Sequence, residues 1–133
     1  MNELTFYSKN IGMRTELGYG ELNVSGDEEH GFRPFQLMVS SIVGCSSGVF
    51  RKILEKQRVT IEDLQVQVKV ERNQDEANRI EKMTINYIIK GRHLDQDKLY
   101  KSLNIARKNC AMVQTVENSI DIEETIETIE LSM

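Results

Sequence analysis

One long apolar segment constrains the fold more than any other part of the chain. Between Phe35 and Gln57, nearly every position in the first two thirds is apolar or small, and charged residues appear only from Arg51 onward. Pro34, the only proline, stands directly before the segment, where a first helical turn tolerates it. The segment therefore predicts a helix that is hydrophobic, and so buried, on all sides.

Small residues mark one face of this helix. Ser40, Gly44 and Gly48 recur every four residues and form a strip on which another backbone can pack closely. Each glycine lowers helix stability by roughly 1 kcal/mol relative to alanine, so we expect packing against the strip to offset that loss. A chain of 133 residues has little material with which to surround such a helix by itself.

Strand patterns occupy much of the remaining chain. Apolar and polar residues alternate over four segments, namely 4–7, 21–24, 64–71 and 83–90. The first two indicate a small antiparallel meander, and the last two indicate a hairpin with one buried face. A final strand is predicted from residue 120 onward.

A second helix is predicted between the hairpin and the final strand. Leu94 and Asp95 have the pattern of a hydrophobic staple followed by an N-cap. The apolar stripe after them has a spacing of four, three and four, and it predicts a core-facing Cys110: its members are Leu99, Leu103, Ala106 and Cys110. The order of elements indicates a single α+β domain over residues 1–133.

Charge and composition argue against several classes of partner and location. The net charge of −4 and the pI near 5.3 disfavour nucleic acid and anionic membranes as partners. The N-terminus lacks the pattern of a secretion signal, and no stretch approaches the roughly 20 apolar residues of a membrane-spanning helix. We therefore expect a cytoplasmic protein whose two cysteines are free thiols or a transient pair.

The two cysteines, Cys45 and Cys110, are the candidate reactive groups, and they do not form a CxxC pair. A thiol in an apolar site is inert, whereas a nearby cation and hydrogen bonds produce a nucleophilic thiolate. Arg14 and Arg33 are the arginines outside the predicted helical and strand faces. Spacing alone allows two interpretations: a peroxide-reactive pair that forms a disulfide, or two ordinary core residues.

Other chemistries have weaker support. His30 and His93 do not share the short spacing with the cysteines that structural zinc sites use. The segment Gly44–Gly48 contains no GxSxG elbow, and there is no glycine-rich phosphate loop. The glutamates of the C-terminal segment are most simply a solvated strand face: Glu123, Glu124, Glu127 and Glu130.

The residues around Cys45 resemble a known family. Arg33 to Leu37, followed by the run from Met38 to Gly44 and then Cys45, is similar to the Pro-x-Glu-Leu…Gly-Cys segment of the OsmC/Ohr family of thiol peroxidases. The separation of Leu37 and Cys45 is also that of the family. The similarity extends over essentially the whole chain, including a second cysteine at the end of the second helix.

This resemblance implies a fold and an activity. The fold would be an intertwined homodimer with antiparallel sheets around a long buried central helix, and no metal or organic cofactor. The activity would be a hydroperoxide reductase, with organic hydroperoxides preferred and an external thiol as reductant. Cys45 would attack the peroxide, Cys110 would resolve the sulfenic acid, and Arg14 would stabilise the thiolate.

The sequence also departs from the family pattern. Phe35 and Gln36 stand where relatives usually carry a glutamate that fixes the arginine. Gln36 can accept a hydrogen bond from a guanidinium, but it cannot offer a bidentate charged pair.

Two alternatives to the peroxidase are a dimer that binds a small hydrophobic ligand without catalysis, and a purely structural partner protein.

Overall fold

The computed structural model describes residues 2–132. The elements in chain order are β1 (Tyr7–Ser8), β2 (Met13–Glu16), β3 (Glu21–Val24), α1 (Pro34–Lys56), β4 (Ile61–Asn73), β5 (Arg79–Gly91), α2 (Gln96–Asn109), α3 (Ala111–Val116) and β6 (Asp121–Glu130). The chain divides into two compact units, Met1–Ser40 and Ser41–Met133, and each has its own three-stranded sheet. The α+β architecture with one long helix agrees with the sequence prediction.

The first unit contains an antiparallel meander in the order β1-β2-β3. Gly12 lies ahead of β2 with a φ of 84°, and a Cβ added there would collide with the Val24 carbonyl oxygen, so the position requires glycine. The buried Thr15 hydroxyl donates to the Thr5 carbonyl at 2.7 Å. The meander confirms the prediction, although its first strand begins at Tyr7 rather than near residue 4.

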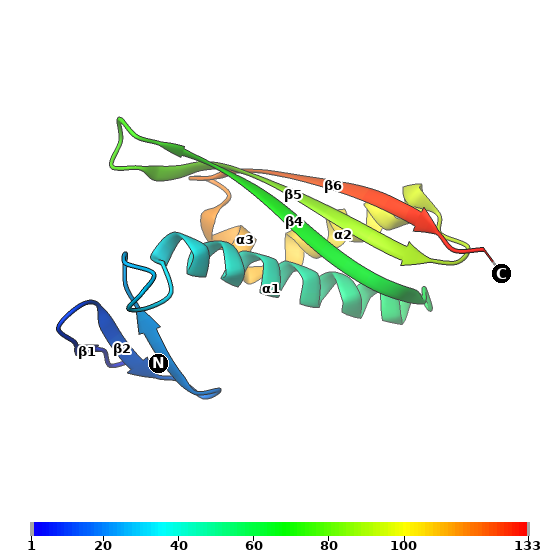
Figure 1. Cartoon of the computed structure of the whole chain (residues 1–133). Helices are drawn as coiled ribbons and strands as arrows, with labels where there is room; N and C mark the ends of the chain where they lie inside the picture. Colours follow the sequence, from blue (N-terminus) through cyan, green and yellow to red (C-terminus); the bar gives the residue numbers. More distant parts are fainter. Residues whose placement is uncertain (1, 133) are drawn as a thin grey trace. The chain divides into compact units, whose positions relative to one another are not determined.

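The second unit has a sheet in the order β4-β5-β6, with the helices on one of its faces (Figure 1). β4 and β5 form the predicted antiparallel hairpin, with Val66 opposite Tyr87. β6 pairs with β5 in the parallel direction, with Ile126 opposite Tyr87. The sheet is therefore mixed.

The sequence prediction of antiparallel sheets was wrong at this point. After β5 the chain crosses the face of the sheet through α2 and α3 before it enters β6. A connection of this kind returns the chain to the end at which β5 began, so the next strand runs parallel to it. Alternation along residues 120–130 predicts a strand but carries no information about its direction.

The central strand β5 supplies the middle of the core. Its inward side chains Met83, Ile85, Tyr87 and Ile89 are fully buried. The helices and β6 cover them with Ile42, Phe50, Leu54, Leu99, Leu103, Ala106, Val113, Ile122 and Ile126. The Phe50 and Tyr87 rings meet edge to face, with centroids 5.5 Å apart, and fix α1 against β5.

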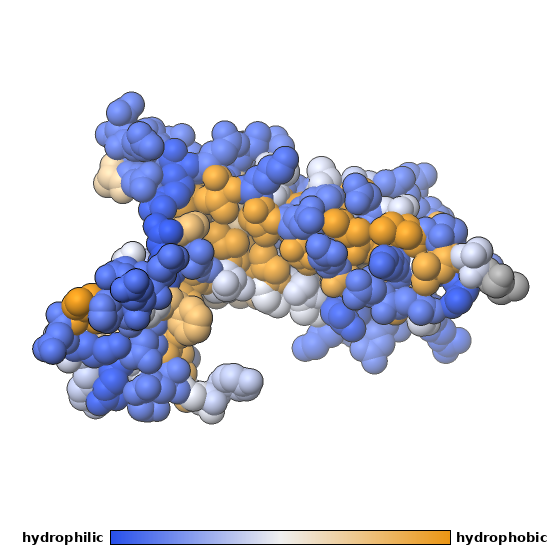
Figure 2. Space-filling view, in the orientation of Figure 1, coloured by the Kyte–Doolittle hydropathy of each residue, from blue (hydrophilic) through white to orange (hydrophobic). Residues whose placement is uncertain are grey.

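Within one chain, α1 is buried along one stripe only. The buried residues are Ile42, Ser46, Phe50 and Leu54, at a spacing of four. The small residues Ser40, Gly44 and Gly48 are exposed. Figure 2 shows apolar side chains gathered along α1 and β4 on the face in view. The prediction of a helix buried on all sides is therefore not met by a single chain, because the sheet covers one side of it.

By length and composition alone, α1 is apolar enough to cross a membrane, with a mean hydropathy of 1.3 over its most apolar 18 residues. The expectation that no segment reaches this level was wrong. Core helices of globular proteins pass the same criterion. The buried stripe packs on the sheet through Ser46 and Phe50, as expected for a core helix.

Candidate functional site

Cys45 lies near the middle of α1, directly before Ser46 of the buried stripe. Its side chain is half-buried, so the sulfur is at the edge of the core. A helix presents neighbouring residues about 100° apart. Cys45 is therefore beside the stripe rather than within it, which leaves its sulfur open on one side.

Cys110 lies at the junction of α2 and α3 and is fully buried, as the apolar stripe of α2 predicted. Its backbone is extended, with φ −89° and ψ 109°, so α2 ends and α3 begins at this residue. Its amide donates to the Arg107 carbonyl at 3.4 Å, and its carbonyl accepts from the Gln114 amide at 2.9 Å. The second thiol is thus held by backbone contacts on both sides.

The two thiols are both free and lie within hydrogen-bond contact of each other. The pKa of Cys45 is lowered by hydrogen bonds from the Met112 amide, the Cys110 thiol and the Ala111 amide, with burial acting in the opposite direction. The pKa of Cys110 is raised, chiefly by burial and also by the nearby Cys45. The geometry therefore favours Cys45 as the thiolate and Cys110 as the neutral partner.

The source of this preference differs from the one expected. The sequence predicted that a cation would decide the ionisation of Cys45, whereas among residues 2–132 the groups that lower its pKa are amides and a thiol. The amides belong to the start of α3, a short helix that the sequence analysis did not predict. The first N–H groups of a helix have no partner within the helix and are available to a neighbouring acceptor.

The remaining predicted site residues belong to the first unit. Arg14 pairs with Glu16 at 3.6 Å and Glu21 at 3.9 Å, and its guanidinium lies over the Tyr7 ring. Gln36 lies exposed in the first turn of α1. Their roles at Cys45 stay predictions.

Arg33, the alternative arginine, also belongs to the first unit. Its guanidinium lies 4.8 Å from the centre of the Phe35 ring. A role for Arg33 at the thiolate likewise stays a prediction.

A largely buried polar cluster beside the cysteines was not predicted from the sequence. The Tyr87 hydroxyl donates to Glu124 Oε2 at 2.9 Å and lies 2.6 Å from Ser46 Oγ. Arg107 Nη1 lies 3.7 Å from Glu124 Oε1. We call these four residues, Ser46, Tyr87, Arg107 and Glu124, the polar cluster.

The prediction of a solvated glutamate face was wrong for Glu124. Only 6% of its side chain is exposed. Burial raises the pKa of Glu124, while Tyr87, Arg107 and Ser46 lower it. The signal was present in the sequence, because residues 122, 124 and 126 share one face of a strand, and both isoleucines at that face are buried.

The cluster also affects the tyrosine. The pKa of Tyr87 is raised by burial, by the charge of Glu124 and, more weakly, by Cys110. Tyr87 therefore stays protonated and can serve as a hydrogen-bond donor at any physiological pH.

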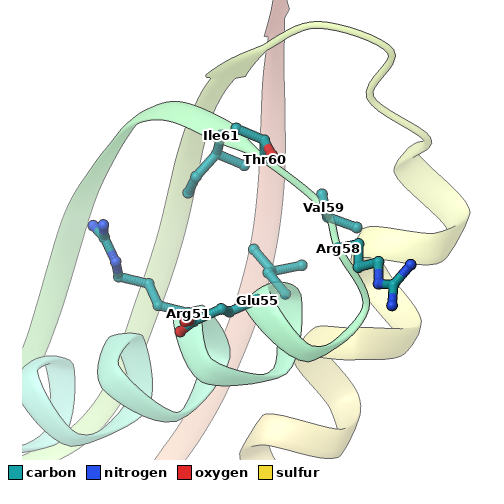
Figure 3. Close-up of a pocket in the computed structure, with 7 residues that line it drawn as sticks. Arg51, Glu55, Arg58, Val59, Thr60 and Ile61 are labelled. Atoms are coloured by element: carbon teal, nitrogen blue, oxygen red, sulfur yellow. The ribbon is translucent and has the colours of Figure 1, made fainter.

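Two cavities of the second unit have linings that do not include Cys45 or Cys110. One of about 310 Å³ lies between the end of α1 and the start of β4, lined by Arg51, Leu54, Glu55, Arg58, Val59, Thr60 and Ile61 (Figure 3). An adjoining cavity of about 410 Å³ extends from Arg58 toward the start of α2. Among residues 2–132, no group of three or more histidine, cysteine or acidic side chains is arranged to hold a metal ion.

The chain is similar to several known proteins. A protein-family model described as OsmC-like protein matches residues 26–125. The chain is 24% identical to protein YhfA of Escherichia coli K12 over 97 residues, 72% of each chain. It is 21% identical to the organic hydroperoxide resistance protein OhrB of Bacillus subtilis over 101 residues, 76% of this chain and 74% of that protein.

A solved structure supports the fold. A hypothetical protein from Aquifex aeolicus VF5 superposes with a TM-score of 0.87 at 20% identity, covering 99% of this chain and 98% of that one. Identity at this level shows the fold alone. The family model extends from the loop before α1 into β6 and includes both cysteines, and on this ground the chain belongs to the OsmC-like protein family.

Proposed function

We propose that this protein is a thiol-dependent hydroperoxide reductase, with organic hydroperoxides preferred. The observation that carries the proposal is the contact between Cys45 and Cys110, in which one thiol has a lowered pKa and the other a raised pKa. A peroxide is attacked by a thiolate, and the resulting sulfenic acid needs a second thiol within reach. The name of the relative OhrB is consistent with this chemistry.

The proposed reaction has two steps within the protein. The Cys45 thiolate attacks one peroxide oxygen, the O–O bond breaks, and the alkoxide leaves and takes up a proton to become an alcohol. The sulfenic acid of Cys45 then condenses with the Cys110 thiol, which forms a disulfide and releases water. An external thiol supplies the two electrons and two protons that restore both thiols.

Several parts of the proposal come from the family resemblance. Arg14 would stabilise the thiolate, and Gln36 would hold that guanidinium in place of the usual glutamate. The reaction would use no metal or organic cofactor, and the protein would act in the cytoplasm.

We also propose a homodimer in which a second copy covers the exposed side of α1. The apolar band along α1 and β4 supports this proposal, because half-buried valines of β4 lie beside a helix with one open face. The small residues Gly44 and Gly48 would allow close approach of the second helix. The partners of the protein would then be a second copy, a hydroperoxide and a thiol reductant.

The central prediction concerns peroxide turnover. Cys45→Ser should reduce turnover of cumene hydroperoxide to the uncatalysed background, because the attacking sulfur is absent. Cys110→Ser should still consume one equivalent of peroxide and stop at the sulfenic acid. Intact mass after one equivalent of peroxide should show a loss of two hydrogen atoms in the wild type, and an added oxygen in Cys110→Ser.

Two results would contradict this proposal. One is turnover by Cys45→Ser at the wild-type rate. The other is a wild-type protein that keeps both thiols after peroxide treatment, which would favour the ligand-binding alternative.

A second prediction concerns the ionisation of Cys45. Cys110→Ala removes one of the hydrogen bonds to the Cys45 sulfur, so the pKa of Cys45 should rise. Thiolate absorbance followed in a pH titration measures this change, with Ser47→Ala on the same helix as the control. If the pKa of Cys45 in Cys110→Ala equals that of the wild type, the hydrogen bond from Cys110 does not favour the thiolate.

A third prediction concerns the arginine. Arg14→Ala should raise the pKa of Cys45 and slow its reaction with peroxide by about tenfold, because a positive charge beside a thiolate favours the ionised form. Arg33→Ala is the matched comparison. If only Arg33→Ala has these effects, the role belongs to Arg33, and Arg14 is excluded.

A fourth prediction concerns the dimer. In one chain, a Cβ added at Gly44 meets nothing within 4 Å, so Gly44→Leu should stabilise an isolated chain by roughly 1 kcal/mol through helix propensity. In the proposed dimer the same side chain collides with the second helix and weakens association. Sedimentation equilibrium measures the association constant of each variant. Asn104→Leu, at an exposed position of α2, is the control. Unchanged association in Gly44→Leu would exclude this face.

A further inference from the structure

Glu124 is the part of the second unit whose position the proposed peroxide reaction does not explain. Its side chain extends from β6 into the core with 6% exposed. A buried carboxylate is unfavourable unless it is paired and hydrogen-bonded. Here Tyr87 donates to it at 2.9 Å, and Arg107 lies 3.7 Å away on its other oxygen.

The contacts of Glu124 lead to both cysteines. On one side, Ser46 Oγ lies 3.5 Å from Glu124 Oε2 and 2.6 Å from the Tyr87 hydroxyl, and Ser46 directly follows Cys45 on α1. On the other side, Arg107 stands one helical turn before Cys110, and its carbonyl accepts the Cys110 amide. One carboxylate therefore connects the helical turns that carry the two sulfurs.

Arg107 extends the connection to α3. Its Nη1 donates to the Ile122 carbonyl at 2.7 Å, and its Nε lies 3.6 Å from Glu117 at the end of α3. The amides at the start of α3 are among the groups that lower the pKa of Cys45. The polar cluster therefore connects α1 and α2 with β5 and β6, and Arg107 also connects α2 with the end of α3.

We propose that Glu124 is a positioning residue that holds the helical turns of Cys45 and Cys110 at disulfide-forming distance. It acts on Cys45 through Ser46 and Tyr87, and on Cys110 through Arg107. The proposal deepens the proposed function, since it concerns the disulfide step of that reaction. Disulfide formation is also measurable without any peroxide, so the two proposals can be tested separately.

The test uses oxidised glutathione as the oxidant. The Cys45 and Cys110 thiols give up two electrons and two protons, a sulfur–sulfur bond forms between them, and one oxidised glutathione becomes two reduced glutathiones. The equilibrium constant of this exchange is the effective concentration of one thiol at the other. It rises when the protein holds the two sulfurs together and falls when their helices are released.

The informative variant is Glu124→Gln, with Glu127→Gln as its control. Glutamine keeps the size and a hydrogen-bond acceptor but removes the charge that faces Arg107. Glu127 lies on the same strand with its side chain exposed. Full-length protein is equilibrated in glutathione mixtures, quenched with acid and analysed by intact mass. We expect Glu124→Gln to lower the effective concentration about tenfold, the order of effect of losing one charge-assisted hydrogen bond.

A second variant, Tyr87→Phe, tests the same proposal in case Glu124→Gln does not fold. Tyr87→Phe keeps the ring that contacts Phe50 and removes the hydroxyl that connects Ser46 with Glu124. Circular dichroism and cooperative unfolding identify the variants that fold. If Glu124→Gln does not fold, the test uses Tyr87→Phe, which should also lower the effective concentration about tenfold. An effective concentration within twofold of the wild type in a folded variant overturns the proposal, as does an equal loss in Glu127→Gln.

The failures of the two proposals look different. A wild type that forms the disulfide with glutathione but does not reduce hydroperoxides refutes the proposed function and leaves the positioning role intact, provided that Glu124→Gln weakens the disulfide. A wild type that reduces hydroperoxides, together with a Glu124→Gln variant of unchanged effective concentration, refutes the positioning role alone.

Discussion

The contact between α1 and β5 is the interaction on which the second unit depends. Phe50 and Tyr87 meet edge to face, and Ser46 reaches the Tyr87 hydroxyl one turn earlier along the helix. Apolar and polar contacts therefore lie on one stripe of α1, and they fix both the rotation and the register of the helix on the sheet. Cys45 adjoins this stripe, so the same contacts determine where its sulfur lies.

The core accommodates buried polar side chains because each of them has a hydrogen-bond partner. Ser46, Tyr87 and Glu124 bind one another, and Ser102 donates to Gln57 between α2 and the end of α1. Among residues 2–132, no buried side-chain nitrogen or oxygen lacks a hydrogen-bond partner. An apolar core tolerates small shifts, whereas hydrogen bonds require defined distances. This requirement gives the site near the cysteines its fixed geometry.

The sequence predicted correctly those elements whose apolar residues follow a local helical or strand periodicity. The long helix, the hairpin and the second helix with its Asp95 cap all appear as expected. The position of Cys110 followed from the stripe of α2. The direction of β6 did not follow, because it depends on the path of the chain through α2 and α3. Glu124 was misassigned because glutamate is rarely buried without a partner, and Arg107, its partner, lies on another element.

The sequence by itself determined the long helix, the hairpin, the second helix, the family and the candidate sulfurs. These depend on local periodicity, on residue type and on the spacing of Leu37 and Cys45. Only the tertiary structure decided that Cys45 meets Cys110, that the amides of α3 favour the Cys45 thiolate, and that Glu124 lies inside the core. Those facts depend on contacts between residues far apart in the chain, and such contacts form only when hydrophobic burial brings the helices onto the sheet.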